Sequence, residues 1–137
     1  MKLKALSLAG LACVLCAGPA AAHHSFAIFD QTKVLYLTGT VKEFEWVNPH
    51  AWLHLNIADA TGKTAMWSFE AGSVAQLAAL GWKRDSFPIG DKVEIGYRPM
   101  KDGSRGGQFM AVKLSNGQKL CSNRGCGDGS GNILAPF

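Results

Sequence analysis

Apolar and polar residues alternate through most of the middle of this chain, which is the period of β-strands that bury one face. The longest such stretch runs from Val34 to Val47. Its apolar phase slips near Glu43, and a β-bulge produces such a slip because one extra residue moves the following side chains to the opposite face. A long first strand that bends at a bulge can pair in two sheets.

Between Gly72 and Gly81 the alternation gives way to helical spacing. Ser73 can cap the amino end and Gly81 can end the segment, so residues 73–80 are expected to form a helix of about two turns. The element order, three strands, a helix and two strands, predicts a mainly β fold. We expect a small five-stranded OB-like Greek-key barrel with one short helix between strands 3 and 4. The other expected strands contain the alternating residues of 51–57, 65–69, 93–97 and 109–114, with a Gly-rich hairpin tip at 101–107.

The chain begins with the pattern of a secretory signal peptide. Two lysines precede an apolar run from Leu6 to Cys16, and the small residues Ala20 to Ala22 follow. No later apolar run approaches the roughly 20 residues that span a bilayer, so we expect a periplasmic protein without membrane association after processing. No periodicity is visible from Asn116 onward. The expected organisation is a signal peptide over residues 1–22, an OB-like β domain over 23–120 and an irregular Gly-rich tail over 121–137.

The charge balance argues against a nucleic-acid partner. The chain has 14 basic and 10 acidic residues, and two lysines leave with the signal peptide, so 12 basic residues (14 − 2) remain. A net charge of +2 steers no partner strongly, and export separates the protein from nucleic acid. The carboxylates of Glu43, Glu45, Glu70 and Asp91 are spread over expected strands and turns, where solvated β faces account for them.

Cys121 and Cys126 are the two cysteines that remain after cleavage, because Cys13 and Cys16 belong to the signal peptide. In an oxidising compartment such a pair tends to close, so we predict a Cys121–Cys126 disulfide. A thiolate metal site is the alternative. The four intervening residues make a looser spacing than the two that are typical of zinc knuckles.

The two histidines that follow the predicted cleavage site are candidate copper ligands. Cleavage after Ala22 gives His23 a free amine beside its own imidazole, as in a copper histidine brace. Cleavage after Ala21 places His24 third from the new terminus, as in an amino-terminal Cu(II)/Ni(II) motif. Both outcomes leave a nitrogen chelate. The competing interpretation, given equal weight, is a His-rich terminus that binds metal only adventitiously.

His50 and His54 are the other two histidines, and both are candidate metal ligands. Their spacing is that of a helical zinc-protease motif, but the glutamate that should follow the first histidine is missing. Asn48-Pro49 could start a helix with both imidazoles on one face. The alternation favours a strand, in which residues four apart lie roughly 13 Å from each other and do not share one ion. Trp52 has the parity of the histidines, so it is a candidate for stacking on a ligand.

Four short runs in the sequence have the same order and spacing as motifs of a known family: HHSF at 23–26, VKEFEWVNPHAW at 41–52, WSFE at 67–70 and LGW at 80–82. Together they resemble a bacterial family of small exported proteins catalogued only as a domain of unknown function. The resemblance covers about residues 23–120 and implies an exported, OB-like β domain, with no established activity. Cys121 and Cys126 lie outside it.

These observations favour an exported periplasmic binding protein that is not an enzyme. The chain has no Gly-x-Ser-x-Gly nucleophile elbow and no cysteine expected to stay reduced. The expected ligand is a metal ion, with Cu(II) first, or a small molecule. The alternative is an accessory module that uses the same surface to dock on a periplasmic oxidoreductase.

Overall fold

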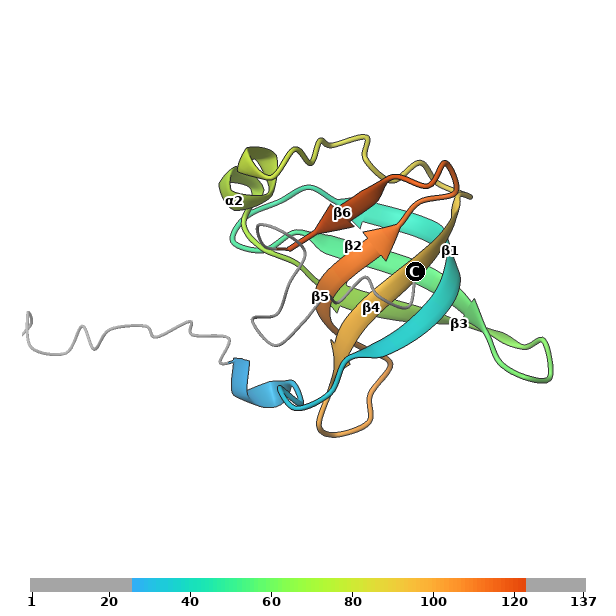
Figure 1. Ribbon diagram of the computed structural model, residues 1–137. Helices are drawn as coiled ribbons and strands as arrows, with labels where there is room; N and C mark the ends of the chain where they lie inside the picture. The colour runs from blue at the N-terminus through green and yellow to red at the C-terminus, as the bar shows by residue number, and fades with distance from the viewer. Residues whose placement is uncertain (1–25, 123–137) are drawn as a thin grey trace, which may run out of the picture.

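The computed structural model describes residues 26–122, in which six strands form a sheet that closes on itself (Figure 1). The predicted signal peptide, His23, His24 and Cys126 lie outside the described residues, so the expectations placed on them stay predictions. The elements in chain order are the 3-10 helix η2 (Phe26–Ile28), β1 (Leu35–Glu45), β2 (Trp52–Ala58), β3 (Thr64–Glu70), α2 (Val74–Ala79), β4 (Lys92–Pro99), β5 (Gly106–Lys113) and β6 (Lys119–Cys121).

Five of these strands form a closed barrel. β1 pairs antiparallel with β2 on one side and β4 on the other, and β3 closes the ring by pairing parallel with β5. α2 lies between β3 and β4 in the chain and stands at one end of the barrel (Figure 1). The predicted five-stranded OB-like barrel with a single short helix is therefore confirmed for residues 26–122, with β6 as an additional strand beside β5.

The first strand serves two neighbours because it bends, as the sequence predicted. Residues 35–40 pair with β4 and residues 40–45 with β2, and the register shifts between Val41 and Glu43. Gly39 lies near the bend, where a Cβ atom would come within 2.5 Å of the Ile57 side chain. The strand can cross its neighbour this closely because Gly39 has no side chain.

The inward faces of the strands and one side of α2 enclose a single core of apolar side chains. Leu77 of α2 is fully buried against the barrel end. The side chain of Ser73 accepts a hydrogen bond from the Gln76 amide, and Gly81 follows the helix with a φ of 90°, so both helix signals are confirmed. The largest fully buried side chains are Phe69, Phe109, Leu53, Leu55, Leu77, Ile95, Val41, Val93 and Val112.

The expectation of irregular chain from Asn116 onward is wrong for residues 119–121. β6 pairs with β5, Leu120 is buried, and the Cys121 carbonyl accepts a hydrogen bond of 3.1 Å from the Trp82 indole. Three residues are too few to produce a visible alternation, so the sequence gives no sign of this strand. Within residues 26–122 no helix is long and apolar enough to cross a membrane.

The amino-terminal segment of the described chain is fastened to the hairpin between β4 and β5. Phe29 forms an isolated bridge with Met100, the Asp30 amide donates to the Pro99 carbonyl at 2.8 Å, and the Lys101 amide donates to the Ile28 carbonyl at 2.9 Å. These bonds hold η2 against one end of the barrel, beside the lower ends of β4 and β5 in Figure 1.

Replacing Gly106 with alanine should open the β3–β5 closure. Gly106 has a φ of 150°, and an added Cβ would meet the Ser68 carbonyl oxygen at 2.1 Å, where only backbone movement gives relief. We expect the free energy of unfolding to fall by about 3 kcal/mol, measured by urea denaturation. The control is Gly62→Ala, because Gly62 also has a positive φ but no atom within 4 Å. Equal losses of about 1 kcal/mol in both variants would contradict this assignment.

Acid should loosen the turn that follows η2. The Asp30 carboxylate accepts hydrogen bonds from the Thr32 hydroxyl at 2.6 Å and from its amide at 3.0 Å, and it pairs with Lys33. These contacts hold the pKa of Asp30 at about 2, below the ordinary 3.8. The stabilisation is therefore complete above pH 3.8 and is lost as the pH falls toward 2. Amide exchange at Thr32, corrected for intrinsic rates, should show this loss, and Asp30→Asn should remove the pH dependence.

Candidate functional site

A row of outward-facing side chains crosses the strands at one level of the barrel. The registers place Glu45 beside Trp52, Trp52 beside Glu70, Glu70 beside Gln108, and Gln108 beside Arg98. Directly opposed residues in a sheet share a face, so these five side chains lie on the outer surface as neighbours. The row contains two carboxylates, one indole, one amide and one guanidinium, and the sequence distributes them over all five barrel strands.

His50 joins this row at Glu70. It lies between β1 and β2, where hydrogen bonds of Ala51 with Gly72 and Ala71 hold the chain against the end of β3. The Nδ1 atom of His50 is 2.5 Å from Oε1 of Glu70. A carboxylate only accepts hydrogen bonds, so Nδ1 carries the proton, and in the neutral ring the lone pair is on Nε2. Metal-binding histidines are commonly oriented by a carboxylate in this way.

Glu70 departs from the expectation of a solvated carboxylate. Its side chain is buried, with 8% exposure, and it is the one buried charged residue among residues 26–122. It is the last residue of β3, where the parallel partner β5 and the segment before β2 cover it. The alternation in β3 places Glu70 on the outer face of the sheet. The burial of this part of the outer face becomes visible only in the closed barrel.

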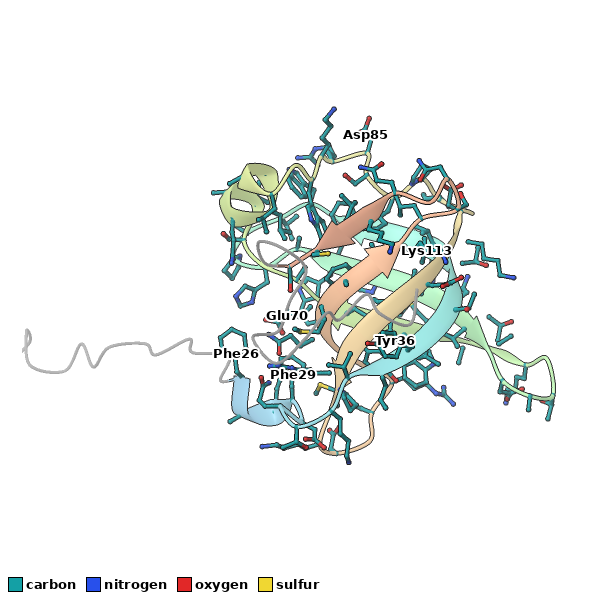
Figure 2. The ribbon with its side chains drawn as sticks, in the orientation of Figure 1. Phe26, Phe29, Tyr36, Glu70, Asp85 and Lys113 are labelled. Atoms are coloured by element: carbon teal, nitrogen blue, oxygen red, sulfur yellow. The ribbon has the colours of Figure 1, made fainter. Side chains whose placement is uncertain are left out.

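A pocket of about 390 Å³ lies beside the His50–Glu70 pair. Its walls come from separate parts of the chain: the amino-terminal segment, the β1–β2 connection, the chain from the end of β3 into α2, the paired strands β4 and β5, and Ser122 after β6. Phe26, Phe29 and Glu70 lie together at this end of the barrel in Figure 2. Aromatic, charged and amide side chains all take part in the lining, which includes Phe26, Phe29, His50, Glu70, Arg98, Gln108, Phe109 and Met110.

A smaller pocket of about 200 Å³ adjoins the first, because Phe29 and Glu70 contribute to both. Trp52 and Ser68 form part of its wall, so it continues the surface along the outer face of β2 and β3. The candidate ligand-facing residue Trp52 is thus half-buried at the border between this pocket and the histidine face.

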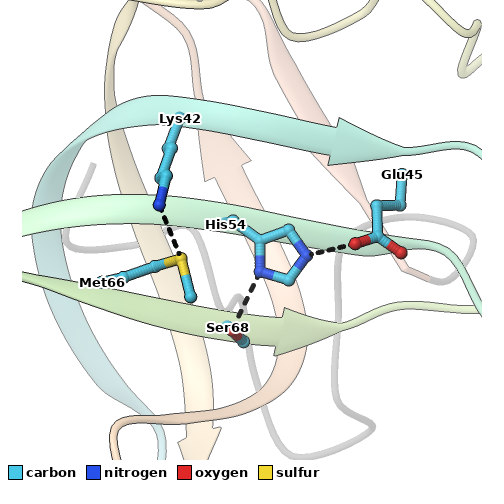
Figure 3. A network of polar contacts seen from close by, with 5 residues as sticks. All are labelled: Lys42, Glu45, His54, Met66 and Ser68. Atoms are coloured by element: carbon cyan, nitrogen blue, oxygen red, sulfur yellow. Dashed lines mark hydrogen bonds and ion pairs between the residues drawn. The ribbon is translucent and has the colours of Figure 1, made fainter.

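His54 lies in a different environment from His50, on the outer face of β2 (Figure 3). Its Nδ1 is 2.9 Å from the Ser68 hydroxyl and its Nε2 is 3.0 Å from Oε1 of Glu45. Trp52 stacks against the imidazole, with ring planes within 8° and centroids 6.5 Å apart. Both ring nitrogens are engaged, so a metal ion could bind His54 only by displacing Ser68 or Glu45.

The strand geometry also separates the two histidines. Residues 52–58 form β2, as the alternation predicted, and His50 precedes that strand. Each histidine has its own carboxylate partner, Glu70 for His50 and Glu45 for His54. No three His, Cys, Asp or Glu side chains within residues 26–122 are grouped closely enough to hold a metal ion. A metal ion at His50 therefore needs donors from outside this range or from solvent.

The bonded series Ser68, His54, Glu45 has the order of a nucleophile, a base and an orienting acid. Acyl transfer also needs hydrogen-bond donors where negative charge develops on the substrate. The Ser68 amide instead donates to the Arg105 carbonyl, at 3.3 Å, and β3 is paired with β5 at this level. We interpret the series as cross-strand polar pairing that orients the outer face. Lys42 adds a contact to Met66 on the same face, at 3.3 Å (Figure 3).

The sequence patterns indicated candidate roles for His50, Trp52 and His54 but not for Arg98 and Gln108. These two lie directly opposite each other at the ends of β4 and β5, and both line the larger pocket. The alternation of β4 identifies Arg98 as outward-facing. This alternation does not predict the pocket, because residues distant in sequence form the other walls.

Comparisons with known proteins place the chain in a family. No curated protein and no solved structure matches it. A family model described as a family of unknown function, DUF6152, matches residues 10–110. This span contains η2, the first four barrel strands and α2, and most of β5. The match confirms the resemblance found in the sequence: the chain belongs to the DUF6152 family, whose function is unknown.

Proposed function

We propose that this protein is an exported, periplasmic, non-enzymatic binding protein that holds Cu(II) through its processed His-His terminus, with His50 as the imidazole added by the fold. The observation that carries the proposal is that Phe26 and His50 line the same pocket. Phe26 follows His23 and His24 directly in the chain, separated from them by Ser25 alone.

Chain connectivity limits how far the two terminal histidines can be from this pocket. Consecutive Cα atoms are 3.8 Å apart, so the Cα atoms of His24 and His23 lie at most about 8 and 11 Å from that of Phe26. Phe26 and His50 line the same pocket, and this supports a copper site that joins the terminus to His50. The hydrogen bonds between the η2 segment and the β4–β5 hairpin hold this segment, from which the two histidines extend, against the barrel.

The donor set suits Cu(II). After cleavage the terminus offers an amine and imidazole nitrogens, and the His50 imidazole, which contacts Glu70 through Nδ1, is the nitrogen ligand that the fold adds. Nitrogen donors of this kind favour Cu(II) over the other divalent first-row ions. The buried Glu70 carboxylate would orient the ring and offset part of the positive charge of the ion. His54 is the weaker candidate because Ser68 and Glu45 bond both of its nitrogens.

A second candidate function is docking on a periplasmic oxidoreductase. The observation that favours it is the exposure of apolar side chains on η2, with Phe26 66% and Ile28 42% exposed at the rim of the two pockets. Exposed apolar groups at a rim suit a protein partner. The two functions separate by experiment, because docking needs Phe26 and Ile28 but does not need an amine at the terminus.

Export should remove residues 1–22. The intact mass of protein recovered from the periplasm is expected to correspond to a chain that starts at His23, because the basic start, apolar run and small residues before His23 match a cleavable signal. A start at Ala22 would keep the metal proposal, with His24 in third place. Recovery of a chain that still carries Met1 would contradict export and the copper site together.

Mature protein should bind one Cu(II) per chain, measured by competition with a chelator of known affinity. His50→Ala is expected to weaken binding at least tenfold, because it removes the ligand supplied by the fold. The matched control is His54→Ala, which should leave the affinity within about twofold. Circular dichroism of both variants establishes that they fold.

A variant with Met-Ser-Ser added before His23 tests the terminus separately. The three extra residues move the free amine away from the His23 imidazole and leave neither His23 nor His24 in third place, so the affinity for Cu(II) is expected to fall at least tenfold. Equal affinity of the native and extended termini, or equal losses in the two histidine variants, would exclude this copper site. The docking function would then be the better explanation of the exposed apolar side chains on η2.

A further inference from the structure

Arg98 is the one cationic side chain among the residues that line the larger pocket. It is half-buried, and its Nε atom is buried without a hydrogen-bond partner. Its Nη1 donates to the side-chain oxygen of Gln31. None of the ion pairs among residues 26–122 includes Arg98.

This environment is unfavourable for a guanidinium group. Arginine remains charged in proteins, and a buried donor without an acceptor loses its bond to water without a replacement. The neutral amide of Gln31 satisfies one nitrogen and leaves the charge uncompensated. An anion that enters the pocket would compensate this charge and accept hydrogen bonds from the guanidinium group.

The rest of the pocket indicates what kind of anion fits. Phe29, Phe109 and Met110 contribute apolar surface, and Gln108 adds an amide beside Arg98. A volume of about 390 Å³ is within the range of sites for small organic molecules. A ligand with one anionic head and an apolar body matches this division, whereas a fully polar ion would leave the apolar walls without contacts.

The geometry points to a binding site for a small aromatic or aliphatic monocarboxylate, held at its carboxylate by Arg98. Gln31 is exposed, and when its side chain moves aside the guanidinium edge that it covers can hold both carboxylate oxygens. Glu70 stands two strands away in the same row, and its negative charge disfavours a second carboxylate on the ligand.

This site goes beyond the proposed copper function and does not depend on it. The carboxylate is bound by Arg98 on β4, whereas the copper ligands are His50 and the processed terminus. Binding of the carboxylate is therefore expected in the presence of a chelator that removes all divalent metal. Failure of copper binding and failure of carboxylate binding are consequently separate results.

The test compares phenylacetate with phenylacetamide, which has nearly the same shape but no charge. Calorimetric titration of the mature protein, with EDTA present, should show phenylacetate binding at least tenfold more tightly than phenylacetamide. The Arg98 Nε–H resonance in a ¹H–¹⁵N spectrum should shift on addition of phenylacetate, because a carboxylate bound to the guanidinium group changes its electronic environment. Acetate, which lacks the apolar body, should bind more weakly than phenylacetate.

Arg98→Gln should abolish the preference for phenylacetate over phenylacetamide. The matched control is Arg105→Gln, because Arg105 is an exposed arginine in the same hairpin and does not line this pocket. The Arg105→Gln variant should keep the preference for phenylacetate. Arg98→Lys keeps the charge but cannot form the bidentate hydrogen bonds of a guanidinium group, so it should retain part of the preference for phenylacetate. Thermal melting establishes that each variant folds.

Three results would overturn the assignment. The first is equal binding of phenylacetate and phenylacetamide to the unmodified protein, and the second is a preference that survives in Arg98→Gln. The third is no detectable binding of phenylacetate together with an unshifted Arg98 Nε–H resonance. Each of these leaves the copper titration, performed without EDTA, as an independent measurement.

Discussion

The parallel pairing of β3 with β5 is the contact on which the rest of the structure depends. It consists of three residue pairs, Ser68 with Gly106, Phe69 with Gly107 and Glu70 with Gln108. A Cβ on Gly106 would come within 2.1 Å of the Ser68 carbonyl, and one on Gly107 within 2.1 Å of the Arg98 carbonyl. Two adjacent glycines thus let three strands approach, and this approach turns an open sheet into a barrel.

The same contact assembles the candidate site. Closure brings Glu70 beside Gln108 and, through Gln108, into one row with Arg98. It also creates the barrel end against which η2 and His50 are held, so the pocket, its buried carboxylate and its guanidinium all follow from three residue pairs. If every antiparallel pairing formed but β3 and β5 stayed apart, the chain would still contain these side chains, but Glu70 would not lie beside Gln108 and the pocket would not form.

The features that the sequence predicted correctly are those set by neighbours along the chain. The bulge near Glu43, the cap at Ser73 and the alternation through Leu53 and Leu55 each depend on a few adjacent residues. The burial of Glu70 and the pocket position of Arg98 depend on the parallel closure, which joins segments almost 40 residues apart and has no local signature. β6 was missed for another reason, since three residues cannot show a period.

The extra strand has a consequence for how the chain behaves among other proteins. In the described part of the chain, β6 covers the part of β5 that lies beyond its pairing with β3, and of its own three residues Leu120 and Cys121 are buried while Lys119 is exposed. Long unpaired edges invite strand addition from other chains, and short edges that carry lysine resist it. On this side of β5 the strand edge that remains is therefore short and carries a lysine, which reduces the opportunity for edge-to-edge aggregation there.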